Sequence, residues 1–164
     1  MATVTSLARA VGGEGNPGRK AYYVEQEIDW AAAATAKGSA LAAADVIEAI
    51  TVPAGTMVLN AGMQVVTAAT GESSDVAIDV GVTGVDADVF VDGFDLDAAA
   101  AGAYAQNAAA FQPVIIGSED TIDVLIQAAT TAPTGGKVRV FAVLMDIGTT
   151  GSTAGALADR DQLA

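Results

Sequence analysis

The densest group of potentially reactive side chains is a run of aspartates in the segment VDADVFVDGFDLD. Closely spaced carboxylates suit Ca²⁺, which takes about six to eight oxygen ligands. The run does not fit an EF-hand loop, because counting from Asp86 places Val91 where that loop needs its sharp-turn glycine. We therefore interpret it as a solvated strand face and turn, and we predict no metal and no other cofactor. The candidate ligands for the alternative, a calcium site, are Asp86, Asp88, Asp92, Asp95 and Asp97.

Composition excludes most other catalytic chemistry. The sequence has no histidine and no cysteine, which rules out histidine acid–base catalysis, histidine-activated nucleophiles and ordinary zinc sites. Carboxylate pairs such as Asp45 with Glu48, or Glu119 with Asp120, are of the type that glycosidases and aspartic proteases use. With twenty acidic residues such pairs arise by chance, and Trp30 is the only tryptophan for a substrate groove. We predict that the protein is not an enzyme.

A glycine motif near the start of the chain has the spacing of a dinucleotide fingerprint, at Gly13, Gly15 and Gly18. It precedes the first credible strand and opens no evident helix, so the context is wrong for that function. A phosphate-binding loop would need Lys followed by Ser or Thr where Arg19 and Lys20 stand. We interpret residues 1–20 as a flexible arm that becomes ordered on a neighbouring molecule.

The charge of the chain limits its partners. Seven basic and twenty acidic residues give a net charge of −13, which repels nucleic-acid phosphates and anionic membrane surfaces. No run of about 18 apolar residues could span a membrane. We therefore predict binding to neither nucleic acid nor membrane, while a basic protein surface remains compatible with the charge.

The elements that must position these side chains are short strands separated by Gly and Pro turns. Residues 75–82 alternate most regularly, with Val76, Ile78, Val80 and Val82 facing one way. Residues 121–128 and 137–147 are predicted to pair as a hairpin, and residues 31–44 suit either a loop or a short helix. The fold class predicted is all-β, an antiparallel β-sandwich or jelly roll. The other predicted strands are 21–28, 45–52, 56–68 and 88–94.

The strand at residues 137–147 is apolar on both faces, which is typical of a central strand or of one covered by another chain. Burial under the N-terminal segment or the Ala-rich connection is an equal alternative to a subunit interface. Because the core is rich in small side chains, we expect an oligomer interface to add stability. The predicted organisation is an arm at 1–20, a β-sandwich domain at 21–148 and a flexible tail at 149–164. The candidate interface residues are Arg9, Arg19, Lys20, Phe141, Val143 and Met145.

Several segments of residues 45–148 are similar to those of a known group of viral proteins. They are the VPAGT turn, the DVGV strand, the FVDGFD segment and the terminal KVRVFAVLMDIG strand. Together they resemble the small capsid decoration, or cement, proteins of tailed bacteriophages, especially those of cyanobacterial and marine hosts.

That resemblance implies a β-sandwich or jelly-roll domain that forms a trimer on the outer capsid surface and clamps adjacent major capsid subunits. The partners would be the major capsid protein and the chain itself, in a virion assembled from protein made in the host cytoplasm. The alternatives are another virion component, such as a tail or head fibre, or a calcium-dependent surface-binding module.

Overall fold

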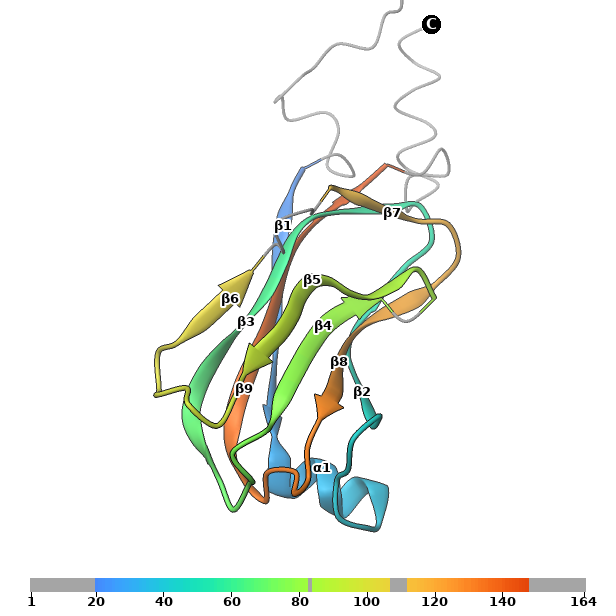
Figure 1. Cartoon of the computed structure of the whole chain (residues 1–164). Helices are drawn as coiled ribbons and strands as arrows, with labels where there is room; N and C mark the ends of the chain where they lie inside the picture. Colours follow the sequence, from blue (N-terminus) through green and yellow to red (C-terminus); the bar gives the residue numbers. More distant parts are fainter. Residues whose placement is uncertain (1–19, 83, 107–111, 148–164) are drawn as a thin grey trace, which may run out of the picture.

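The computed structural model describes residues 20–82, 84–106 and 112–147, and these residues form two antiparallel sheets packed face to face with one short helix (Figure 1). The predicted all-β sandwich is thereby confirmed. The predicted arm and tail lie outside the described residues, apart from Lys20. The elements are β1 (Tyr22–Asp29), α1 (Trp30–Lys37), β2 (Val46–Val52), β3 (Thr56–Thr70), β4 (Ala77–Val82), β5 (Asp86–Asp95), β6 (Tyr104–Gln106), β7 (Val114–Ile116), β8 (Asp120–Ala128) and β9 (Gly135–Asp146).

The strands are shared between two sheets in jelly-roll order. Sheet A has the order β1-β9-β3-β6, with β7 also paired to β3, and sheet B has the order β2-β8-β4-β5. Among the described strands, β4 and β5 are the only two that follow each other in the chain and also pair with each other in a sheet. Most connections therefore cross from one sheet to the other, as expected of a Greek-key sandwich.

The predicted hairpin between residues 121–128 and 137–147 is wrong. Strand β8 pairs with β2 and β4 in sheet B, whereas β9 pairs with β1 and β3 in sheet A. The loop between them instead crosses the sandwich, and it is held where the Thr134 backbone N–H donates to the Thr70 carbonyl at 3.0 Å. Alternation predicts which face of a strand is buried, but it does not identify the neighbouring strand.

The core follows the predicted alternation closely in β4. Ile78, Val80 and Val82 are fully buried between the sheets, as is Val76 just before the strand. Met63 from sheet A and Phe90 from sheet B are among the largest fully buried side chains. Burial of apolar area at roughly 25 cal/mol per Å² stabilises this contact between the two layers.

Strand β3 departs from its expected pattern. Residues Met57 and Leu59 were expected on the same face as Ala61, yet they are half-buried while Val58 is fully buried. The cause is an irregularity in the pairing with β9 between Val58 and Asn60. An extra residue at this β-bulge shifts the alternation by one position.

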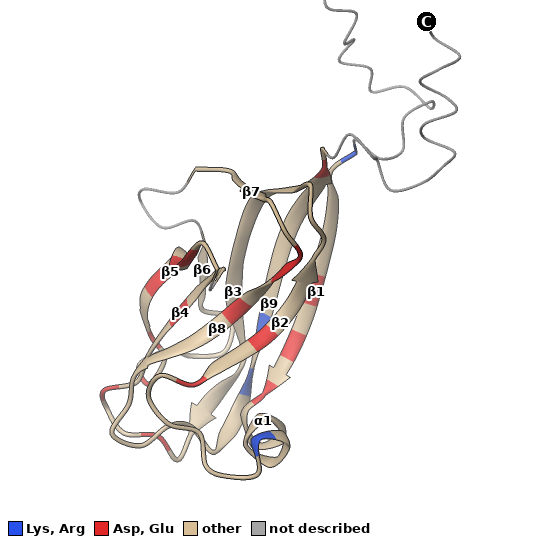
Figure 2. Ribbon diagram, turned by 90° about the vertical axis from the view of Figure 1, so that its right-hand side faces the viewer, with Lys and Arg blue, Asp and Glu red and all other residues tan. Residues whose placement is uncertain are grey.

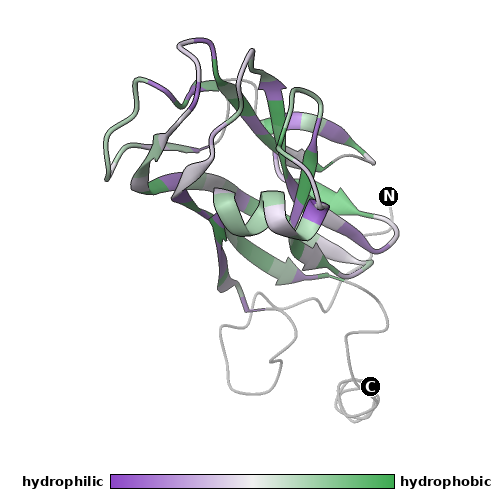
Figure 3. Cartoon of the chain, turned by 90° about the horizontal axis from the view of Figure 1, so that it is seen from below, coloured by the Kyte–Doolittle hydropathy of each residue, from purple (hydrophilic) through white to green (hydrophobic). Residues whose placement is uncertain are grey.

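The ambiguous segment at residues 31–44 begins as a helix. Helix α1 lies across one end of the sandwich, between the two sheets (Figure 3). Asp29 caps it by accepting a hydrogen bond from the Ala32 backbone N–H at 3.1 Å. Trp30 anchors it in the core with no exposed surface, and Gly38 ends it in the left-handed conformation. No helix in the described ranges is long and apolar enough to cross a membrane.

Candidate interaction surfaces

The predicted aspartate run lies on β5 and the turn after it, and it is divided into two groups. Asp88 and Asp92 interact with Asp79 of the neighbouring strand β4, and Asp86 interacts with Asp88. Asp95 and Asp97 interact with each other, and burial together with the Asp95 carboxyl raises the pKa of Asp97. The described residues contain no group of three acidic side chains arranged to hold a metal ion.

The electrostatics of the first group are repulsive. A hydrogen bond with the Asp86 carboxyl raises the pKa of Asp88, and desolvation and the charges of Asp86, Asp92 and Asp79 raise it further. Desolvation also raises the pKa of Asp79, which is only 3% exposed, although the Gly93 backbone N–H donates to it at 2.7 Å. The neighbouring carboxylates therefore make ionisation of Asp79 and Asp88 less favourable.

The β5 aspartates and Glu48 form an acidic surface on the outer face of sheet B, above the nearly buried carboxyl groups of Asp79 and Asp123, which are 3% and 4% exposed. Asp79 and Asp123 lie between inward-facing core residues of β4 and β8, and Glu48 of β2 is the direct cross-strand neighbour of Asp123. The alternation predicted for residues 75–82 puts Asp79 opposite the core face, but it gives no link to Asp123 or Glu48. The strands involved are paired only in the folded chain, so alternation within one strand could not reveal the surface.

A glycine brings β5 close enough to β4 to complete this surface. Gly81 lies between the inward-facing residues Val80 and Val82, so a side chain there would point outward. An added Cβ would collide with the backbone of Asp86 and Ala87. Strand β5 therefore curls over the outer face of β4, in keeping with the interaction of Asp88 with Asp79.

The outer face of sheet A is chemically different, and it holds the predicted interface residues of β9. Phe141, Val143 and Met145 are half-buried on this face, because Val140, Ala142 and Leu144 occupy the core face. Strand β9 is central in its sheet, with β1 and β3 on either side, which is one of the two alternatives that its apolar faces suggested; cover of its outer face by another chain stays a prediction.

Neighbouring strands extend the apolar area around these three residues. Tyr23 of β1 stacks on Phe141 with ring centroids 6.3 Å apart. Met145 is paired across to Met57 of β3, which is paired in turn to Ile115 of β7. Tyr23 and Ile115 are each 56% exposed. This apolar area, called the β9 patch below, consists of Tyr23, Met57, Ile115, Phe141, Val143 and Met145.

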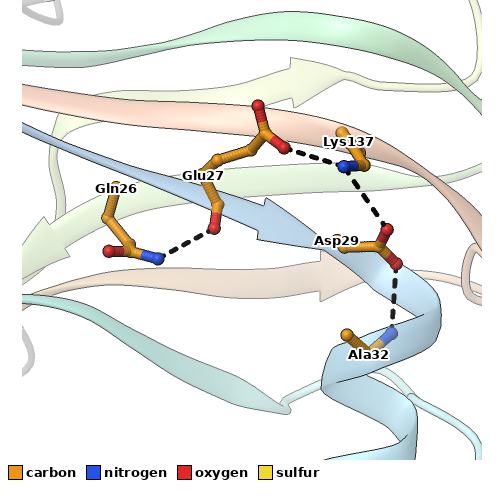
Figure 4. Close-up of polar contacts among 5 residues, drawn as sticks. All are labelled: Gln26, Glu27, Asp29, Ala32 and Lys137. Carbon is orange, nitrogen blue, oxygen red and sulfur yellow. Dashed lines mark hydrogen bonds and ion pairs between the residues drawn. The ribbon is translucent and has the colours of Figure 1, made fainter.

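Beside the β9 patch lies a group of ion pairs (Figure 4). The Lys137 ammonium is 2.9 Å from a Glu27 carboxylate oxygen and 3.8 Å from an Asp29 oxygen, and the Glu27 hydrogen bond raises the pKa of Lys137. The Arg139 guanidinium is 3.7 Å from Glu25, whose carboxylate also accepts from the Tyr23 hydroxyl at 2.8 Å. Figure 2 shows these two cations on β9 next to the acidic β1.

The remaining predicted residues are not gathered into either surface. Lys20 is exposed just before β1, while Arg9 and Arg19 lie outside the described residues. Two of the four carboxylates considered for catalysis have structural partners: Asp45 pairs with Lys37 at 2.5 Å, and Asp120 accepts from the Thr121 backbone N–H at 2.8 Å.

A cavity of about 400 Å³ lies between α1 and the loop that joins β8 to β9. Alanines, threonines, Leu41 and Pro133 line it, and it contains no charged side chain. It therefore offers no acid–base pair and no side-chain base that could activate its threonine hydroxyls.

Comparison with known proteins places the fold among phage capsid chains. A chain in the solved cyanophage Pam1 capsid asymmetric unit has a TM-score of 0.58 and 18% identity, over 87% of this chain and 96% of that chain. A chain in the capsid of Ralstonia phage GP4 has a TM-score of 0.55 and 18% identity, over 79% of this chain and 86% of that chain. No protein-family model and no curated protein matches the sequence. At such identities the similarity establishes a common fold.

Proposed function

We propose that the protein is a virion structural protein that decorates and stabilises the outer surface of a tailed-phage capsid. It acts as a homotrimer that clamps adjacent major capsid subunits. The observation that carries the proposal is the fold similarity to the cyanophage Pam1 capsid chain, because it extends over 96% of that chain and not only over an embedded part. The sequence resemblance to cement proteins supports the same role.

The proposed mechanism is association alone. Several weak contacts made by one trimer on a regular lattice act together, so the attachment is far tighter than any single contact. Because such a protein binds the assembled shell and not the separated subunits, it stabilises the shell by mass action. The absence of histidine and cysteine from the sequence is in keeping with a role that needs no catalytic step.

The charge supports a position on the outside of the shell. A chain with a net charge of −13 is repelled by packaged DNA, whereas contact with capsid protein is unaffected by that repulsion. The proposed partners are therefore the major capsid protein and further copies of this chain. Neither nucleic acid nor membrane is a proposed partner, and synthesis takes place in the host cytoplasm.

Co-sedimentation tests the proposal. Purified protein is mixed with expanded shells that lack it, from the virus that encodes it, and the shells are pelleted. Saturable binding in multiples of three copies is the expected result, with weaker binding to unexpanded shells. Protein that stays in the supernatant at tens of micromolar refutes decoration. Cryo-electron microscopy of the whole particle separates a capsid position from a tail or head-fibre position.

A further inference from the structure

The two outer faces of the sandwich differ sharply in charge. The four strands of sheet B contain no Lys or Arg, and the outer face of that sheet exposes Glu48 and the aspartates of β5 above the buried Asp79 and Asp123. In the outer face of sheet A, Lys137 and Arg139 balance most of the charge of Glu25, Glu27 and Asp29. Two copies of this acidic protein therefore repel each other least when the outer faces of their sheets A meet.

The composition of sheet A's outer face also suits a contact between proteins. The β9 patch is built from Tyr, Phe, Met, Ile and Val, and an arginine stands at its border. Aromatic residues, Met and Arg are enriched at protein interfaces, whereas Asp, Glu and Lys are depleted from their centres. The ion pairs on one side of the patch leave this face with little net charge, so an acidic partner is not repelled there.

We infer that the outer face of sheet A is the surface through which copies of this chain associate with one another. In the homotrimer of the proposed function, on which this inference rests, the three faces surround the common axis. Acids lie on β1 and cations on the adjacent β9. A neighbouring copy whose β1 lies over β9 therefore offers the opposite charge, while the apolar patches bury each other. The acidic face of sheet B is left turned away from this contact.

A matched set of substitutions tests the surface. Ile115 of the β9 patch and Val85, in the turn between β4 and β5, are both 56% exposed, so Ile115→Glu and Val85→Glu each introduce the same charge at an equally exposed position. Val143→Glu places a charge at the centre of the patch. Sedimentation velocity at about 1–50 μM measures self-association, and circular dichroism with thermal melting checks that each variant is folded.

Wild-type protein is expected to sediment as a multiple of 16.2 kDa, threefold for the trimer. Ile115→Glu and Val143→Glu are expected to raise the dissociation constant by about 30-fold or more, as loss of an interface hot spot does. Val85→Glu should match the wild type. A monomeric wild type overturns the inference, because the patch would then serve another protein or another part of this chain. The inference is also overturned if Ile115→Glu associates as tightly as the wild type, or if Val85→Glu dissociates as much as Ile115→Glu does.

Sedimentation with shells separates this inference from the proposed function. A wild type that associates through the β9 patch but never binds shells leaves the inference standing and refutes decoration. A wild type that binds shells as a monomer refutes the inference together with the trimer, but leaves decoration of the shell standing.

Discussion

Replacing Gly81 with alanine tests the close approach of β5 to β4. The new Cβ would lie under 3.0 Å from the Ala87 carbonyl group and from the Asp86 carbonyl oxygen. These are backbone atoms, which cannot rotate away, so β5 must move outward by up to about 1 Å to restore ordinary contact of about 3.4 Å. Overpacking of this kind costs about 3 kcal/mol. At about 3 °C per kcal/mol for a domain of this size, the melting temperature should fall by about 9 °C.

Urea unfolding measures the change, with the fluorescence of Trp30 as the probe because this single tryptophan is fully buried. All variants are compared at one protein concentration, since self-association changes apparent stability. Gly117→Ala is the matched control, because its Cβ would have no neighbour within 4 Å and its φ is not positive. That control should be neutral or gain up to about 1 kcal/mol. A Gly81→Ala variant within about 0.5 kcal/mol of the wild type would refute the close approach.

Three further predictions concern the carboxylates. Asp88→Asn should stabilise the protein at pH 7 by less than about 1 kcal/mol. The reason is that Asp86 and nearby charges raise the pKa of Asp88, so its ionised form is unfavourable in the fold. This gain should shrink as the pH falls through the raised pKa, and melting curves between pH 7 and 4 will test it. Asp75→Asn should lower the melting temperature at pH 7, because hydrogen bonds from Ser73 and Thr130 lower the pKa of Asp75 to about 2 from 3.8. The contribution of Asp75 is complete above pH 3.8 and lost as the pH falls through about 2, so the variant and the wild type should converge in acid. Calcium chloride at a few millimolar should raise the melting temperature no more than magnesium chloride of equal ionic strength does. The reason is that the described carboxylates form no group of three metal ligands. A calcium-specific rise that EDTA abolishes would contradict this prediction.

The sequence predicted the fold class because period-two alternation is a local property. In β4 the inward positions Ile78, Val80 and Val82 follow it without interruption. The pairing of β8 and β9 with strands distant in the sequence could not be predicted, because many strands satisfy the same alternation. The bulge after Val58 also gives no local signal. Strands as short as β6 and β7 are too brief to show a period.

The sequence also predicted part of the candidate interaction surface on sheet A, but not all of it. Phe141, Val143 and Met145 were identified because an apolar outer face is unusual for a strand, and the structure places them together on that face. Their role in association stays a prediction. Tyr23 and Ile115 were missed, because they join the patch only through cross-strand pairing.

The antiparallel pairing of β1 with β9 aligns Tyr22 with Leu144, so the described chain enters and leaves the sandwich side by side (Figure 1). Adjacent strands are only about 4.8 Å apart, so a foreign peptide fused before Tyr22 would emerge beside one fused after Asp146. A peptide inserted into the loop following α1 would instead project from the opposite end of the domain. The protein therefore offers two well-separated attachment points for display, one at each end.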